Sequence, residues 1–120
     1  MSAQIEGSTR AFRAGGAIGA YKRVILSSGK LALAGVGATD YGNEIGITEQ
    51  AAFADGDVIS VRLRNAPGTR KATAATSFAV GAVIYGAAAG NIDDVSSGTQ
   101  LGIALEAATA LNDVVEFLPI

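Results

Sequence analysis

IGITEQAAFADGDVISV, residues 45–61, aligns without a gap on LGIALEAATALNDVVEF, residues 101–117, at an offset of 56 positions. Each copy reads as a short strand, a turn that contains Asp, and a second strand. Two copies are fewer than the roughly three units that an open solenoid needs to bury a continuous core. The pattern therefore predicts one small β-domain with internal pseudo-symmetry. Seven positions are identical in the two copies: Gly46, Ile47, Ala51, Ala52, Ala54, Asp57 and Val58 all recur.

A weaker similarity precedes each copy. AIGA at 17–20 matches AVGA at 79–82, at an offset of 62. The repeat is therefore predicted to cover residues 17–64 and 79–118, with six extra residues in the first copy.

Alternation of apolar and polar side chains predicts a strand over residues 58–64. Ile59 and Val61 and their repeat partners, Val115 and Phe117, are predicted to face one core. Strands every 8 to 12 residues or so, separated by Gly, Asn and Asp turns, are typical of small all-β folds. The predicted fold class is all-β, a small β-barrel or β-sandwich built from two related strand units.

The first residues lack any such period. Residues 1–16 carry Ser, Thr and Arg and end in Ala-Gly-Gly, which predicts an extended N-terminal arm before a β-domain at 17–120. An aromatic side chain flanked by Arg is suited to binding a partner. The arm is therefore predicted to anchor the protein, the alternative being a tail without a role. The predicted contacts are Ile5 and Phe12 as apolar groups and Arg10 and Arg13 as charged groups.

The chain has no His and no Cys, so the commonest general base and the thiolate nucleophile are absent. The pairs Asp55/Asp57 and Asp93/Asp94 are interpreted as turn residues that bond their own backbone, since Ca²⁺ needs six to eight oxygen ligands. Residues 27–30, SSGK, lack the spacing of a phosphate-binding loop. No enzymatic activity, cofactor or metal is predicted.

Charge is unevenly distributed although the net charge is only −2. Every Lys and Arg lies within residues 10–71, and residues 72–120 carry five acids and no base. The molecule is therefore either electrically polarised or evened out by folding. Neither a basic stripe nor an apolar run of about 20 residues is present. The sequence predicts a protein made in a cytoplasm, with neither nucleic acid nor membrane as a partner.

Six motifs spread over residues 15–118 form one pattern: GGAI (15–18) leading to RV (23–24), EIGI (44–47), ADGDVISV (54–61), FAVGAVIY (78–85), LGIAL (101–105) and NDVVEF (112–117). With these motifs the chain resembles the small tailed-bacteriophage proteins called capsid cement or head decoration proteins, of the DUF2190 family. The resemblance implies a β-rich, often trimeric virion protein, made in the host bacterium, that binds the outer capsid surface and clamps neighbouring capsomers. It implies the major capsid protein and further copies of the chain as partners, and it carries no catalytic residues.

The apolar C-terminal stretch VVEFLPI, residues 114–120, is the predicted oligomer interface, the alternative being an inner strand. The interface residues predicted for the oligomer are Val115, Phe117, Leu118 and Ile120.

Two alternative functions predict different surfaces. A fibre module or carbohydrate-binding domain predicts an exposed aromatic cluster, and a DNA-associated protein predicts a basic stripe.

Overall fold

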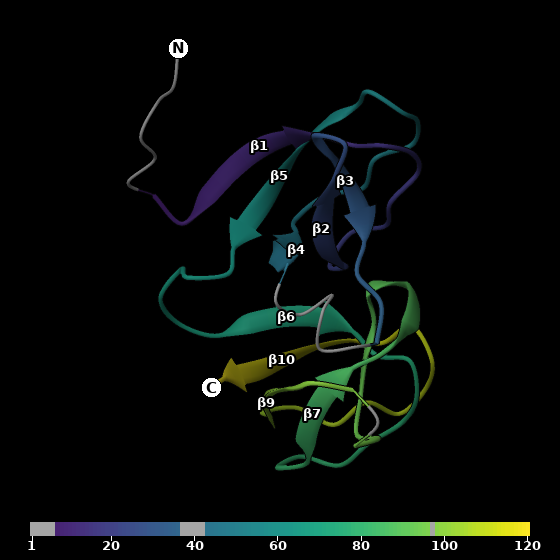
Figure 1. The fold of residues 1–120 in the computed structure, drawn as a ribbon. Coiled ribbons are helices and arrows are strands. Elements are labelled where there is room, and N and C mark those ends of the chain that lie inside the picture. The colour runs from purple at the N-terminus through teal and green to yellow at the C-terminus, as the bar shows by residue number, and fades with distance from the viewer. Residues whose placement is uncertain (1–6, 37–42, 97) are drawn as a thin grey trace.

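The computed structural model describes residues 7–36, 43–96 and 98–120. Within these ranges the chain folds into two five-stranded antiparallel sheets with the same strand order (Figure 1). We call them the first and second units. The first unit has the order β1-β5-β4-β2-β3: β1 (Thr9–Arg13), β2 (Arg23–Ser27), β3 (Lys30–Leu33), β4 (Glu44–Thr48) and β5 (Val58–Leu63). The second has the order β6-β10-β9-β7-β8: β6 (Arg70–Thr73), β7 (Val83–Gly86), β8 (Ile92–Asp93), β9 (Gln100–Ala104) and β10 (Val114–Pro119), with the 3-10 turn η1 (Ala88–Gly90) between β7 and β8.

Each sheet curls until its edges meet. Directly after β1, Ala14 forms a parallel bridge with Leu31 of β3, and directly after β6, Ala74 forms the same bridge with Ile92 of β8. Closure in this way leaves less of each sheet edge unpaired. Each unit is a small β-barrel, and the predicted fold class, two related strand units in an all-β protein, is confirmed.

Close backbone packing explains the glycine that recurs in the repeat. A Cβ on Gly46 would lie 2.0 Å from the carbonyl oxygen of Arg62, and a Cβ on Gly102 would lie 2.0 Å from that of Leu118. Neither position can hold a side chain without moving a neighbouring strand. The same steric requirement is therefore met in both units.

The recurring aspartate closes the turn before the last strand of each unit. The Asp57 carboxylate accepts hydrogen bonds from the amides of Phe53 and Ala54. The Asp113 carboxylate accepts the equivalent bonds from Thr109 and Ala110. The interpretation of Asp57 as a turn residue is confirmed.

The two units correspond over more of the chain than the sequence indicates. The bridge between Ile18 and Ala52 matches the bridge between Phe78 and Ala108. The offset in this region is 60, so the alignment at 62 is wrong. The alignment at 62 pairs Gly81 with a glycine of the first unit. In the structure the equivalent of Gly81 is instead Tyr21, because both have a left-handed backbone (φ 85° and φ 58°).

The predicted arm is partly folded. β1 pairs with β5 from Thr9 opposite Arg62 to Arg13 opposite Val58. The arm prediction is wrong for residues 9–14, because pairing with β5 orders a segment that has no period of its own. Ile5 and the rest of residues 1–6 lie outside the described residues.

Two cores replace the predicted single one. Ile59 and Val61 lie in the core of the first barrel, whereas Val115 and Phe117 lie in that of the second. The prediction that all four face one core is wrong because each sheet closes on itself. The first core also contains Ala14, Ile18, Val24, Leu31 and Ala52; the second contains Ala72, Ala74, Phe78, Ile84, Ile92, Leu101, Ala104 and Ala108.

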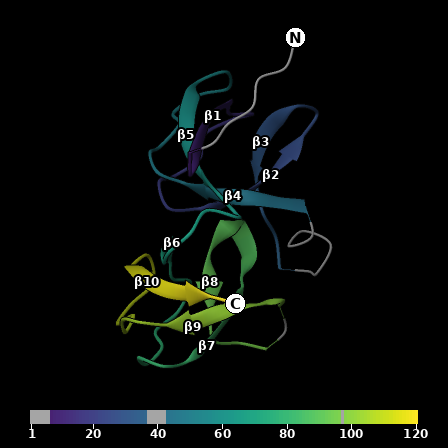
Figure 2. The ribbon, with the colours of Figure 1, turned by 90° about the vertical axis from the view of Figure 1, so that its left-hand side faces the viewer.

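The barrels lie end to end in a body of 44 × 28 × 24 Å (Figure 2). The outer face of the first sheet meets the second unit. Ile47 of β4 belongs to the second core. Backbone hydrogen bonds also cross, from the amide of Thr73 to Tyr21 and from the amide of Gly90 to Ala34. One face of the first sheet is thus an internal interface.

Candidate functional site

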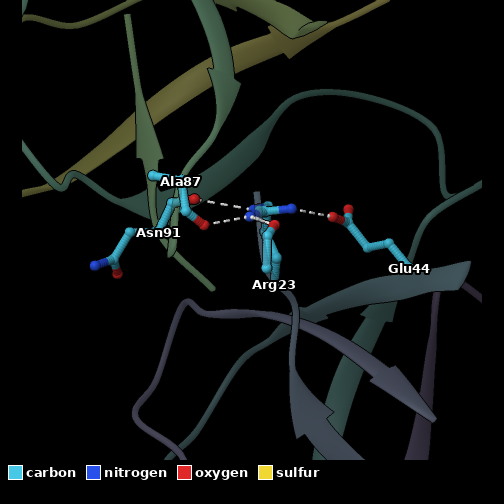
Figure 3. A network of polar contacts seen from close by, with 5 residues as sticks. Arg23, Glu44, Ala87 and Asn91 are labelled. Carbon is cyan, nitrogen blue, oxygen red and sulfur yellow. Dashed lines mark hydrogen bonds and ion pairs between the residues drawn. The ribbon is translucent and has the colours of Figure 1, made fainter. Parts of the chain in front are cut away.

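A buried arginine joins the two units (Figure 3). Arg23 lies on the outer face of β2 and is fully buried. Its guanidinium pairs with the Glu44 carboxylate of the same unit at 2.9 Å. It also donates to the carbonyl oxygens of Asn91 (3.0 Å) and Ala87 (2.7 Å) in the second unit and of Gly35 (2.9 Å) in the first. Arg23 therefore fixes how the hairpin of β7 and β8 sits against the first sheet.

The surroundings of this joint are closely packed. A Cβ on Gly90 would lie 2.7 Å from the carbonyl oxygen of Arg23. Burial raises the pKa of Glu44, and the charge of Arg23 opposes that rise. The ammonium group of Lys22 donates to the side chain of Asn91, and burial lowers the pKa of Lys22. The network is a structural joint made of paired polar groups.

A cleft of about 360 Å³ opens beside the joint, between the units. Arg62, Lys71 and Glu116 are among the residues that line it. The Nε atom of Arg62 is buried and has no hydrogen-bond partner among the described residues. In the described part of the chain no group of three or more acidic side chains could hold a metal ion. The cleft is therefore lined by charged side chains, and the described residues form no metal site in it.

The residues predicted to anchor the protein are divided between two faces of β1. Arg10 and Phe12 lie on the face that carries Ile59 and Val61 of β5. The Arg10 guanidinium carbon lies 4.6 Å from the centre of the Phe12 ring, a cation–π contact. Phe12 packs against the first core. Part of the Phe12 ring surface is therefore already buried within the first barrel.

Arg13 lies on the opposite face of β1 and is exposed. It donates a long hydrogen bond of 3.4 Å to the carbonyl oxygen of Gly56. The structure thus brings Arg10 and Phe12 together and directs Arg13 elsewhere.

Half of the predicted oligomer interface is wrong. Val115 and Phe117 point into the second core and are buried, because β10 alternates in and out of the barrel. They cannot line a contact with another molecule. Leu118 and Ile120 are exposed.

Sequence reasoning missed an apolar surface beside Leu118. The outer face of the second sheet carries exposed aliphatic side chains on three neighbouring strands. The available signal was apolar residues at both phases of the alternation in 101–105 and 114–118, which indicates burial on two sides of a sheet. The members of this surface are Val83, Ile103, Leu105 and Leu118, and we call it the outer face of the second unit.

The end-to-end arrangement keeps the charge asymmetry of the sequence. The second unit carries Arg70 and Lys71 at its first strand and has only acidic charges beyond them. Of the two alternatives left by the sequence, the fold therefore supports polarisation, because the two halves are not interleaved. In the described ranges no helix is long and apolar enough to cross a membrane.

Comparison with known proteins shows the fold. No family model matches the sequence, and no curated protein matches it significantly. A solved structure described as the head fiber gp8.5 N base in bacteriophage phi29 matches with a TM-score of 0.69 and 19% identity. The match covers 93% of this chain and 92% of that one. The chain has the fold of that fibre base; membership of the DUF2190 family stays a prediction.

Proposed function

We propose that this protein is a structural component of a bacteriophage head, bound to the outer surface of the shell. The observation that carries the proposal is the fold match to a head fibre base over nearly the whole of both chains. The sequence motifs that resemble those of head decoration proteins support the same role independently. At 19% identity the likeness itself establishes the fold, so an experiment must test the role.

In this proposal the protein clamps neighbouring capsomers by binding the major capsid protein. A body 44 Å long, with its two barrels fixed by a buried joint, suits contact with more than one neighbour. Such a clamp resists internal DNA pressure because many moderate contacts must break together before the shell opens. Its action requires a rigid shape and complementary surfaces.

The proposed capsid contacts lie in and before β1. Arg10 and Arg13 are exposed on this edge strand, and the anchor extends back to Ile5. Arginine pairs with carboxylates through two parallel hydrogen bonds, which gives geometric specificity at the rim of a contact. We propose that Arg10 and Arg13 bind acidic groups of the shell, while Phe12 supports Arg10 from below.

The test is binding of the purified protein to undecorated phage heads, measured by co-sedimentation and negative-stain imaging. Arg10→Ala combined with Arg13→Ala should weaken binding by about tenfold, or 1.4 kcal/mol. The loss should shrink at high salt, which screens exposed charges. Lys71→Ala, an exposed base on the second unit, is the matched control. Unchanged binding of the double variant would place the contact elsewhere.

A second candidate is a module at the base of a phage fibre, which the description of the matching structure favours. The two roles predict different images of decorated heads. A clamp gives density between capsomers, whereas a fibre base gives a projection from one position. A reconstruction of decorated heads separates them.

We further propose that the protein acts as a homotrimer, as the family resemblance implies. Leu118 and Ile120 remain candidates for the contact between copies, since both are exposed at the end of β10. Apolar side chains in such positions are typical of surfaces that a partner covers.

A further inference from the structure

The two units place the same residue in the same register with opposite burial. Ile47 lies between Arg23 and Arg62 on neighbouring strands, and Ile103 lies between Val83 and Leu118 in the equivalent positions. Ile47 is 3% exposed and Ile103 is 40% exposed. The difference arises because the second unit covers this face of the first sheet. Nothing in the described part of the chain covers it on the second sheet.

The uncovered face is also the more apolar one. The first unit has the charged residues Arg23, Glu49 and Arg62 around its isoleucine, where the second has Val83, Leu105 and Leu118. These three are 38%, 41% and 48% exposed.

The fold does not require aliphatic residues at these positions, because the first unit has charged ones in the same register. Direct cross-strand neighbours have Cβ atoms about 5 Å apart, so Val83, Ile103 and Leu118 form one unbroken row. Contiguous exposed apolar surface of this kind marks a contact site. The row therefore indicates a partner that is absent from the isolated chain.

We propose that the outer face of the second unit packs against the same face of further copies of this chain. It is the register counterpart of a face that already binds a barrel of this fold, inside the chain itself. The contact rests on the proposed self-association but not on capsid binding.

Contact between unlike faces is less favourable. The covered face of the first unit holds its partner through hydrogen bonds from Arg23 to the carbonyl oxygens of Ala87 and Asn91. Val83 stands in the place of Arg23 and cannot donate such bonds. The face therefore needs an apolar partner. Other exposed apolar side chains are scattered: Phe53, Val80 and Leu111 lie at turns, and Leu26, Leu33 and Val58 of the first unit pair with side chains that are buried or charged. Among the described residues, the row on the second sheet is the one in which exposed aliphatic side chains are direct cross-strand neighbours.

The first experiment measures mass by sedimentation velocity over a range of concentrations, without phage heads. The wild type should form an oligomer. Leu105→Glu combined with Leu118→Arg should weaken association at least about tenfold. Both substitutions introduce the residue found in the first unit, so folding should persist, as circular dichroism would verify. Phe53→Thr, which also copies its repeat counterpart, is the matched control and should associate like the wild type.

The second experiment uses the absence of cysteine from the sequence. Ile103→Cys should give disulfide-linked pairs under mild oxidation, because like residues meet across the contact and disulfides need Cα atoms within about 7 Å. Phe53→Cys, equally free of other thiols, should link far more slowly. A monomeric wild type, unchanged association of the double variant, or equal linking of the two cysteine variants would overturn the inference. Head binding is assayed separately, so its failure leaves these results unaffected.

Discussion

The two barrels share one strand order, but their equivalent outer faces carry different side chains and differ in burial. The first unit buries Arg23 beside Ile47, whereas the second leaves Val83 beside Ile103 in solvent. The second unit is held on the face of the first by hydrogen bonds from Arg23 to backbone carbonyl oxygens. An aliphatic side chain cannot form such bonds. The repeat thus preserves the barrel while the side chains of this one face determine what it binds.

The buried arginine gives direction to the internal interface. Guanidinium hydrogen bonds are geometrically strict, so Arg23 favours one placement of the hairpin carrying Ala87 and Asn91. The aliphatic row of the second unit supplies area with less directional constraint. A fixed internal joint and a more adaptable outer contact therefore arise from the same strand positions.

Arg23→Met should have the largest effect. It removes a guanidinium that donates to four acceptors and leaves Glu44 buried without its ion-pair partner. Breaking a buried ion pair on one side costs about 3–5 kcal/mol. Urea unfolding followed by circular dichroism measures the loss. Val83→Met, at the equivalent position of the second unit, should change stability far less; comparable losses would contradict the contrast between the two faces.

Gly46→Ala and Gly102→Ala test what the units share. In each case the new Cβ meets a backbone oxygen 2.0 Å away, and forced shifts of packed strands cost about 1–3 kcal/mol or more. Similar losses are expected in both variants, measured as unfolding free energies. Gly16→Ala, which has open space around it, is the control. Tolerance at one of the two sites alone would show that the repeat is looser there.

The strands and turns of the repeat could be predicted because local sequence specifies them. Asp57 and Gly46 have counterparts that perform the same local tasks. β1 could not be predicted from its own residues, because its strand conformation depends on pairing with β5. Closure into two barrels was missed because the bridges after β1 and β6 join alanines to distant strands.

The candidate surfaces were harder to predict than the strands. Ile47 and Ile103 are identical in residue and register, so no local pattern distinguishes the buried one from the exposed one. The distinction depends on Arg23 and Val83 in other strands. The predicted interface at Val115 and Phe117 failed for a related reason: an apolar strand does not reveal which of its two faces is internal.

Gly81→Ala should have a moderate effect. Gly81 has a left-handed backbone with φ 85°, and the equivalent Tyr21 keeps φ 58° while its side chain packs against the second core. A left-handed conformation costs an ordinary residue about 1–2 kcal/mol. Alanine at 81 incurs that strain without packing to offset it, since the surrounding space is open. A thermal melt should show the loss; an unchanged Tm would mean that this turn readily changes conformation.

Thr109→Val should have the smallest effect, and that effect should be present at neutral pH and disappear at acid pH. The Asp113 carboxylate accepts hydrogen bonds from the Thr109 amide, the Thr109 hydroxyl and the Ala110 amide. These bonds, led by that of the Thr109 amide, lower the pKa of Asp113 below its ordinary value of 3.8. The first unit has Phe53 in the place of Thr109 and so lacks the hydroxyl bond.

A lowered carboxyl pKa stabilises the folded state fully above the ordinary pKa, and this contribution is lost as pH falls through the folded pKa. Without the hydroxyl, the pKa of Asp113 should rise towards its ordinary value, and the stability that this carboxylate contributes at neutral pH should shrink. Carboxyl NMR titration would detect the rise. Urea unfolding at a series of pH values would detect a small loss of stability at neutral pH that disappears at acid pH, where Asp113 is protonated in both the folded and the unfolded state. Thr76→Val, an exposed threonine after β6, is the control. If the unfolding free energies of Thr109→Val and the wild type coincide at neutral pH as well, the hydroxyl bond contributes nothing and the two turns are equivalent despite their different residues.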